Sequence, residues 1–124
     1  MSGNPLTTQI GGNHYTAMKY QPIEFAMKCQ LNPVQFSIVK YVSRYKNKNG
    51  LQDLAKALHF CQIADTLDKE PIEDDIHWLT SEIYKFIHDN RMSPLQDLII
   101  SFACTKQYKN AAEKMRQLMV ESDD

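Results

Sequence analysis

The chain has 124 residues, of which 43% are hydrophobic and 23% are charged, and its net charge is −1. This length and composition are typical of one globular domain and exclude a largely disordered chain. The apolar runs are too short to span a membrane, and residues 1–5 lack the basic and apolar parts of a secretory signal, so we expect a cytoplasmic protein with no membrane partner.

Charge is divided unevenly along the chain. Residues 14–62 hold seven Lys or Arg against two acidic residues, a net charge of +5, whereas residues 63–124 hold seven against thirteen, a net charge of −6. The basic segment can attract phosphate, and the acidic segment can cover the basic one or a neighbouring subunit. We therefore expect a homo-oligomer in which opposite charges face each other.

A polar, Gly-rich lead-in at residues 1–12 precedes the first helical signals. Pro22 opens a short predicted helix, and Asn32-Pro33 predicts an N-cap followed by a helix to about Lys48. Asn49-Gly50 ends that helix, with Gly50 as a left-handed C-cap. Its apolar stripe consists of Val34, Ile38, Tyr41, Val42 and Tyr45.

A second long helix is predicted from Leu51 to about Lys69, antiparallel to the first. Its expected buried side consists of Leu51, Leu54, Ala55, Leu58 and Cys61. Further helices are predicted at 73–89, after an N-cap at Ser93-Pro94, and through 111–119. They should bury Ile76, Trp78 or Leu79, Ile83, Phe86 and Ile87, then Leu95, Leu98, Ile99 and Phe102, then Ala111, Ala112, Met115, Leu118 and Met119.

These patterns predict an all-α fold, with an antiparallel helical-hairpin module followed by further helices. No β alternation and no sequence repeat is visible, only a recurring style of helical hairpin. We divide the chain into a flexible lead-in (1–12), a basic helical-hairpin nucleotide-binding module (13–69) and an acidic helical extension (70–124). Cys29, Cys61 and Cys104 are expected as buried free thiols, because no C-x-x-C pair indicates zinc.

Candidate ligand-binding residues begin with three cations spaced i, i+4, i+8, which places Lys40, Arg44 and Lys48 on one face of a helix. Bound phosphate would relieve their mutual repulsion. The alternative is a solvated face whose long side chains cover apolar surface, and spacing alone favours that alternative.

Asp53 and Lys56 lie one turn apart at the start of the next helix, followed by His59. Asp53 is expected either to interact favourably with the helix dipole or to orient a nucleobase or Arg44. Lys56 is expected either to pair with Asp53 or to reach a phosphate. His59 on a polar face is more often a surface residue than a catalyst.

The loop Gly11-Gly12-Asn13-His14-Tyr15 is a further candidate. Its glycines allow close approach of a ligand to the backbone, and His14 and Tyr15 can stack on a base or hydrogen-bond to it. A terminal loop that packs its own aromatic rings is the alternative. The chain has no Walker A or dinucleotide-binding glycine motif.

Three ordered blocks together resemble a family of small phage proteins, mostly uncharacterised, over residues 10–62. One branch of that family forms the C-terminal part of a coliphage nucleotide kinase, which phosphorylates deoxynucleoside monophosphates without a Walker motif. The resemblance implies a phage or prophage origin and a nucleotide ligand, with functional roles for Lys40, Arg44, Asp53 and Lys56. The blocks are Gly11-Gly12-x-His14-Tyr15; Gln21-Pro22-Ile23-Glu24; and Lys40-Tyr41-x-x-Arg44-Tyr45-Lys46-x-Lys48-Asn49-Gly50-Leu51-x-Asp53-Leu54-x-Lys56-Ala57-x-His59.

The acidic extension offers two weaker signals. Glu70, Glu73, Asp74 and Asp75 could hold Mg²⁺ in an enzyme if a facing set included Glu82, but an acidic helix N-terminus explains them better. The last two helices have too few clustered Lys and Arg residues for a DNA-binding helix-turn-helix, so no nucleic-acid partner is expected.

The predicted ligand set is His14, Tyr15, Lys40, Tyr41, Arg44, Lys48, Asp53 and Lys56. It supplies phosphate clamps but few groups for catalysis, and no metal ligand or cofactor is predicted unless the protein is an enzyme using Mg²⁺. The favoured hypothesis is a non-catalytic nucleotide-binding phage protein that sequesters a nucleotide signal of host defence. The alternatives are a Walker-less deoxynucleoside monophosphate kinase and a protein-binding inhibitor of a host factor.

Overall fold

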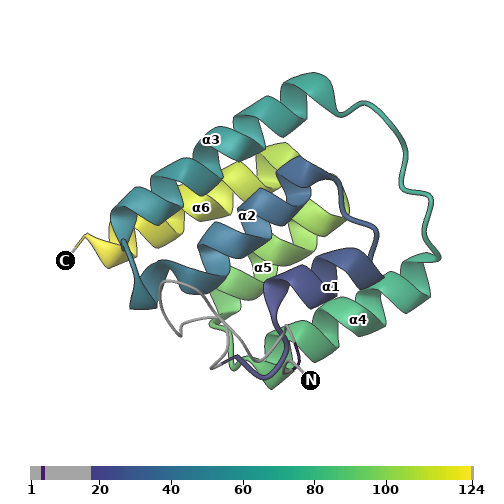
Figure 1. The fold of residues 1–124 in the computed structure, drawn as a ribbon. Coiled ribbons are helices and arrows are strands. Elements are labelled where there is room, and N and C mark those ends of the chain that lie inside the picture. Colours follow the sequence, from purple (N-terminus) through teal and green to yellow (C-terminus); the bar gives the residue numbers. More distant parts are fainter. Residues whose placement is uncertain (1–3, 5–17, 124) are drawn as a thin grey trace.

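The computed structural model describes residue 4 and residues 18–123, and in them the fold is all-α, as predicted (Figure 1). None of the helices in these residues is long and apolar enough to cross a membrane. The helices in chain order are α1 (Pro22–Lys28), α2 (Pro33–Arg44), the 3₁₀ turn η2 (Tyr45–Asn47), α3 (Leu51–Leu67), α4 (Ile76–Asp89), α5 (Pro94–Cys104) and α6 (Tyr108–Ser122).

Two helices begin at capping boxes of the same form. At the start of α2 the Asn32 side chain accepts the Gln35 N–H at 2.8 Å, and the Gln35 side chain accepts the Asn32 N–H at 2.9 Å. At the start of α5, Ser93 and Gln96 exchange the same two bonds at 3.2 and 2.9 Å. Both predicted N-caps are confirmed, because a polar cap followed by Pro acts through local backbone geometry.

The turn between α2 and α3 differs from the prediction. Regular α-helix ends at Arg44 rather than near Lys48, and the chain tightens into η2, where the Tyr45 carbonyl accepts the Gly50 N–H at 2.9 Å. Gly50 has a positive φ of 52° with ψ −125°, so it is the N-cap of α3 and not a left-handed C-cap. A glycine suits this position because other residues strongly disfavour such a backbone conformation.

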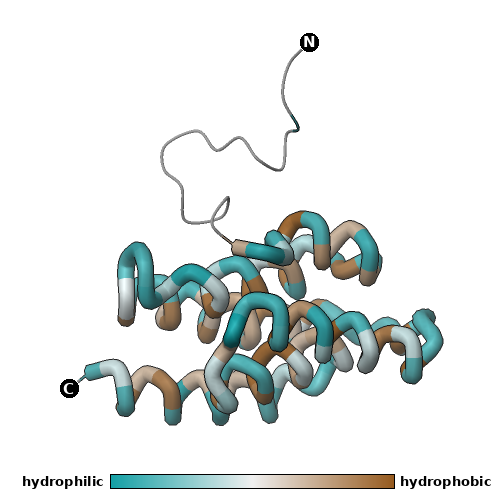
Figure 2. Tube along the Cα trace, turned by 90° about the horizontal axis from the view of Figure 1, so that it is seen from below, coloured by the Kyte–Doolittle hydropathy of each residue, from teal (hydrophilic) through white to brown (hydrophobic). Residues whose placement is uncertain are grey.

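The helices lie in two layers when viewed from below, and polar and apolar residues alternate around their turns (Figure 2). Helices α2 and α3 pack against each other as the predicted hairpin; α5 packs on α2, and α6 on both α3 and α5. One hydrophobic core draws on residues before and after position 70. The acidic segment therefore covers the basic one within the chain, and association between chains stays a prediction.

Burial along the helices departs from the single stripes that were predicted. On α3, Leu54 and Cys61 are buried, but Ala55 is exposed, while Asp53, Ala57 and Ala64 are buried. Helix α3 is covered by both α2 and α6, so its buried side is set by two neighbours. On α4 and α5 the predicted Ile76 and Leu98 are 48% and 40% exposed.

The three cysteines are free and buried, as predicted. Burial raises the pKa of Cys29 and of Cys61 to about 12, against an ordinary thiol value near 9. For Cys29 the Glu82 and Asp74 charges raise it further, whereas Arg116 partly opposes the rise at Cys61. These thiols remain protonated at neutral pH and behave as small apolar groups.

Candidate functional site

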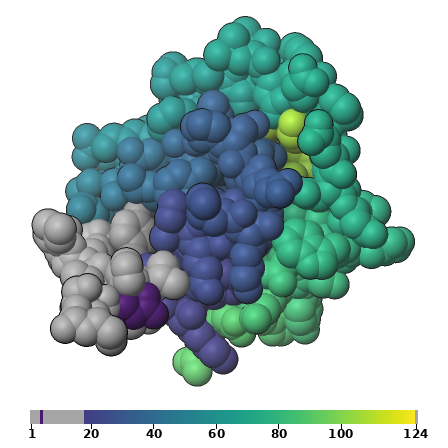
Figure 3. Space-filling model, turned by 45° about the vertical axis from the view of Figure 1, so that its right-hand side comes forward, coloured from purple at the N-terminus to yellow at the C-terminus, as the bar shows by residue number. Residues whose placement is uncertain are grey.

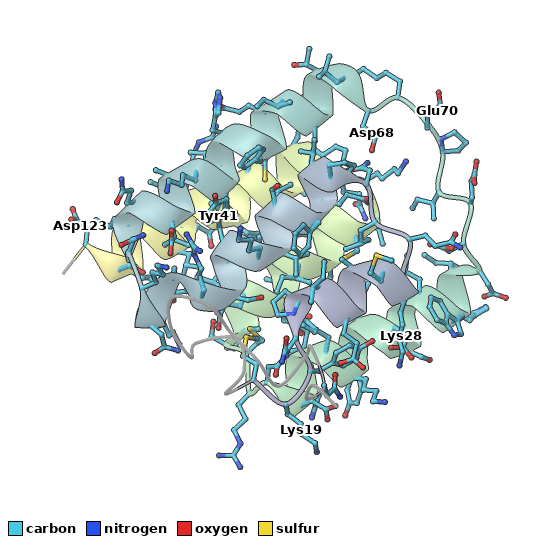
Figure 4. The ribbon with its side chains drawn as sticks, in the orientation of Figure 1. Lys19, Lys28, Tyr41, Asp68, Glu70 and Asp123 are labelled. Carbon is cyan, nitrogen blue, oxygen red and sulfur yellow. The ribbon has the colours of Figure 1, made fainter. Side chains whose placement is uncertain are left out.

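A cluster of cations surrounds the ring of Tyr41, which lies where α2 faces α3 (Figure 4). The Arg44 guanidinium carbon lies 4.7 Å from the ring centroid, and the Lys40 and Lys56 ammonium nitrogens each lie 5.4 Å from it. These separations are within the range of cation–π attraction. We refer to Lys40, Tyr41, Arg44 and Lys56 as the cationic cluster.

Beneath the cluster, Arg44 holds a carboxylate that has no solvent exposure. Its Nε and Nη2 donate to the two oxygens of Asp53, each at 3.1 Å, and the Asn49 N–H donates to Asp53 at 3.3 Å. The Arg44 side chain is 11% exposed and that of Asp53 is 0% exposed. This two-point geometry fixes the plane of the guanidinium group.

Competing effects set the protonation of Asp53. Burial alone raises the pKa of this carboxyl group, but hydrogen bonds from Arg44 and Asn49, with the charges of Arg44 and Lys56, outweigh it. The net result is a pKa below the ordinary value. Asp53 is therefore an anion that pairs with Arg44, which is one of the predicted roles, and its side chain has no solvent exposure.

Three of the predicted site residues, Lys40, Arg44 and Lys56, thus meet around Tyr41, and Arg44 also pairs with Asp53, but Lys48 does not extend the row of cations. Lys48 lies beyond η2 with a non-helical backbone (φ −139°, ψ −97°), and its side chain is exposed. The predicted i, i+4, i+8 row fails at this residue because α-helix ends at Arg44. The predicted residues His14 and Tyr15, with the glycines before them, lie outside the described residues.

Phe60 joins the cluster although the sequence did not single it out. Its ring lies parallel to that of Tyr41, with centroids 6.0 Å apart and planes inclined by 10°. His59, on the exposed side of α3, lies with its ring centroid 6.5 Å from that of Phe60. Phe60 follows Lys56 by one helical turn, which is the signal that could have placed both side chains on one face.

The cluster has an excess of positive charge. Its three cations face one carboxylate, that of Asp53, which leaves a local charge of +2 before Lys46 and Lys48 are considered. In the space-filling view, the surfaces of α1 and α2 (dark blue) lie between those of α3 (blue-teal) and α4 (green-teal) (Figure 3). The positive charge of the cluster can bind an anion, and its aromatic rings can contact a planar group.

The acidic extension supplies no comparable site. Asp75 caps α4 by accepting the His77 and Trp78 N–H groups, and Glu82 accepts the Tyr20 hydroxyl at 2.7 Å. Within residue 4 and residues 18–123, no three His, Cys, Asp or Glu side chains gather as metal ligands. The acidic residues near the start of α4 thus include a helix cap, as the more conservative interpretation predicted.

A groove of about 520 Å³ lies between α4 and α5, away from the cationic cluster. Its floor includes Ile83 and Ile87, and Tyr84 stacks on His88 at one wall with ring centroids 4.0 Å apart. Of the predicted ligand set, none of the residues that the structure describes lines it. The groove has no excess of Lys and Arg over Asp and Glu, since its lining includes one of each sign, Arg91 and Asp97.

Comparison with known proteins gives one finding that bears on the site. No curated protein and no solved structure matches the chain. The cluster residues, from Lys40 to Phe60, all fall within the segment of the chain that matches a family model. Residues 10–62 match the model of a protein family of unknown function, DUF3310.

Proposed function

We propose that this protein binds a nucleotide at the cationic cluster without chemically converting it. The observation that carries the proposal is the ring of Tyr41 with Lys40, Arg44 and Lys56 within 4.7–5.4 Å of its centroid. A nucleotide combines phosphate charge with a planar base, and the cluster combines cations with aromatic rings.

Electrostatics supports an anionic ligand. Like charges gathered around one ring repel one another, and the repulsion is stronger at the lower effective dielectric of a protein surface than in bulk water. Asp53 offsets one charge only. Phosphate oxygens between Lys40 and Lys56 would remove the remaining repulsion and accept charge-assisted hydrogen bonds.

Aromatic contact supports a base. Tyr41 and Phe60 are half-buried, so part of each ring remains open to solvent. Stacking of a base on such a ring contributes about 1–3 kcal/mol. His59 beside Phe60 offers a further ring and a hydrogen-bonding group.

The chemistry of the cluster supports binding over catalysis. Phosphoryl transfer needs a group that orients the attacking hydroxyl, in addition to phosphate clamps. Asp53 is the carboxylate of the cluster, and it is fully buried, hydrogen-bonded to Arg44 and Asn49, and held below its ordinary pKa. It is therefore a poor proton acceptor, and its lack of solvent exposure makes it a poor contact for a bound substrate.

The biological role that we propose is sequestration of a nucleotide signal of host defence by a phage or prophage protein. It rests on the resemblance of residues 10–62 to small phage proteins. Sequestration requires release of the ligand unchanged, whereas a kinase would convert it.

Calorimetric titration with nucleoside mono-, di- and triphosphates and with cyclic nucleotides tests the binding. We expect at least one to bind, and we expect Lys40→Gln and Lys56→Gln each to weaken it by about 1.5–3 kcal/mol. Lys85→Gln is the matched control, because Lys85 also lies near a tyrosine ring, 5.7 Å from the Tyr20 centroid, but outside the cluster. Absence of binding across the panel, or equal loss in the control, would overturn the proposal.

Arg44 needs a different experiment. Arg44→Ala should also weaken binding by about 1.5–3 kcal/mol, but it leaves the buried Asp53 unpaired and so affects folding. The affinity of the Arg44→Ala variant is therefore interpreted only if circular dichroism shows that the variant has the same helical content as the unaltered protein. Mass spectrometry of the nucleotide after release distinguishes sequestration, with unchanged mass, from phosphorylation, with an added phosphoryl group.

A further inference from the structure

The second half of the chain repeats the first in its order of elements. The segment Asn32-Pro33-x-Gln35 that starts α2 recurs sixty-one positions later as Ser93-Pro94-x-Gln96 at the start of α5. The left-handed residue before each cap is repeated as well: Gln30 has φ 55° and Arg91 has φ 53°. The sequence alone gave no visible repeat, because few of the paired residues are identical.

Burial follows the same correspondence. The pairs Phe25 and Phe86, and Ile38 and Ile99, are 0% exposed. In the last helix of each half, the pattern of buried residues matches at a separation of fifty-four instead of sixty-one. Buried pairs in this register are Leu54 and Tyr108, Ala57 and Ala111, Cys61 and Met115, and Ala64 and Leu118.

Contacts between the two halves are reciprocal. The Gln35 Nε2 donates to the carbonyl of Ala103 at 3.1 Å, and the Gln96 Nε2 donates to the carbonyl of Val42 at 2.9 Å. Val42 and Ala103 are themselves an equivalent pair, sixty-one positions apart. Phe25 and Phe86, also equivalent, stack on each other with centroids 4.3 Å apart. In a two-fold interface, when one residue of the first copy contacts a second residue of the other copy, the equivalent contact is made in the opposite direction. The contacts between the two halves follow this pattern.

We infer that residues 83–122 occupy the position that a second copy of residues 22–68 would occupy, and that they carry a counterpart of the cationic cluster in which neutral residues replace its three cations. The chain is then a pseudo-dimer within one polypeptide, with one anion site instead of two. The statement about the anion site rests on the proposed function, whereas the equivalence of the two halves does not.

The counterpart of the cluster keeps its ring but not its charges. Tyr41 corresponds to Phe102, which is half-buried. The cations Lys40, Arg44 and Lys56 correspond to Ser101, Thr105 and Asn110. The ion pair between Arg44 and Asp53 has a neutral equivalent in the hydrogen bond from Gln107 Nε2 to Thr105 Oγ1, at 2.9 Å.

This correspondence predicts that three substitutions create a second cluster. In the full-length triple variant Ser101→Lys, Thr105→Arg, Asn110→Lys, three cations surround Phe102 as three surround Tyr41. Calorimetry with inorganic pyrophosphate should give one bound anion per chain for the unaltered protein and two for the triple variant. The control, Thr66→Lys, Ser81→Lys, Gln117→Arg, adds the same charges at exposed positions on three different helices and should still bind one.

A measurement without ligand separates this inference from the proposed function. Clustered cations repel one another and salt screens the repulsion. Raising NaCl from about 0.02 M to about 0.5 M should therefore raise the melting temperature of the triple variant by more than that of the scattered control. If pyrophosphate binds to none of the proteins, the salt response alone decides the equivalence, and the nucleotide titrations decide the proposed function separately.

Two results would overturn the inference. The first is that the triple variant folds but binds one pyrophosphate per chain, the same number as the unaltered protein. The other is a salt response equal to that of the scattered control. If the triple variant does not fold, the double variant Ser101→Lys, Asn110→Lys leaves the bond between Thr105 and Gln107 intact and is subject to the same two criteria.

Discussion

Gln35 and Gln96 each cap the helix that they start and donate to the end of the helix that the other starts. Their side-chain oxygens accept the N–H groups of Asn32 and Ser93, and their Nε2 groups donate to the carbonyls of Ala103 and Val42. Both are 3% exposed. Each glutamine therefore connects local helix initiation to the packing of α2 on α5.

Replacing either glutamine with leucine should lower the free energy of unfolding by about 1–3 kcal/mol, because a helix N-terminus and a buried carbonyl both lose a partner. The two losses should be similar in size, as the contacts are reciprocal. Urea denaturation measures them. Gln117→Leu, at an exposed position of α6, is the control and should stay within about 0.5 kcal/mol of the unaltered protein; a similar loss there would contradict the prediction.

Asp53→Asn should destabilise the protein by about 3 kcal/mol, since it leaves the Arg44 guanidinium buried without its counter-charge. The comparison is Asp65→Asn on the same helix, whose carboxyl is half-buried and pairs with no cation in the described residues. Guanidinium denaturation measures both variants. A loss below about 1 kcal/mol for Asp53→Asn would mean that Arg44 finds an equivalent partner.

Acid should destabilise the fold through two carboxyl groups. Desolvation opposes ionisation of Asp53 and Asp68, but hydrogen bonds and nearby cations (Arg44 for Asp53; Tyr108 and Lys106 for Asp68) hold the pKa of each below its ordinary value. The unfolded chain then binds protons at a higher pH than the folded chain does. The stability that they contribute is complete above the ordinary carboxyl pKa of about 4 and is lost as pH falls through the lower folded values.

Urea denaturation between pH 7 and pH 3 measures this loss. In Asp53→Asn the fall of stability over that range should be smaller than in the unaltered protein, because one of the two linked groups is gone. An identical pH profile would show that Asp53 does not titrate differently in the folded and unfolded states.

Gln30→Gly and Arg91→Gly should each stabilise the protein by about 0.5–1 kcal/mol, because both residues end a helix with a positive φ that glycine adopts without strain. Lys106 ends α5 in the same way with φ 61°, but its ammonium group lies 3.1 Å from Asp68. Lys106→Gly should therefore gain less. Thermal melting of the three variants checks the order, and destabilisation by Gln30→Gly would contradict the strain argument.

Sequence alone determined the all-α class, the N-caps at Asn32 and Ser93, and the hairpin that brings Arg44 to Asp53. These features depend on residues close together in the chain, where capping and helical spacing act directly. The same reasoning placed Lys40, Tyr41 and Lys56 in the predicted ligand set, and the structure brings the three side chains together. It failed at Lys48, because the 3₁₀ turn after Arg44 ends the regular spacing.

Only the tertiary structure decided which side chains are buried and how the two halves meet. Gln35 and Gln96 are polar, and their burial depends on partners from distant segments that no helical pattern reveals. The reciprocal contacts of α2 with α5 likewise join residues more than fifty positions apart. Periodicity along a helix predicts that one face is apolar, but only packing selects the neighbouring helix that covers it.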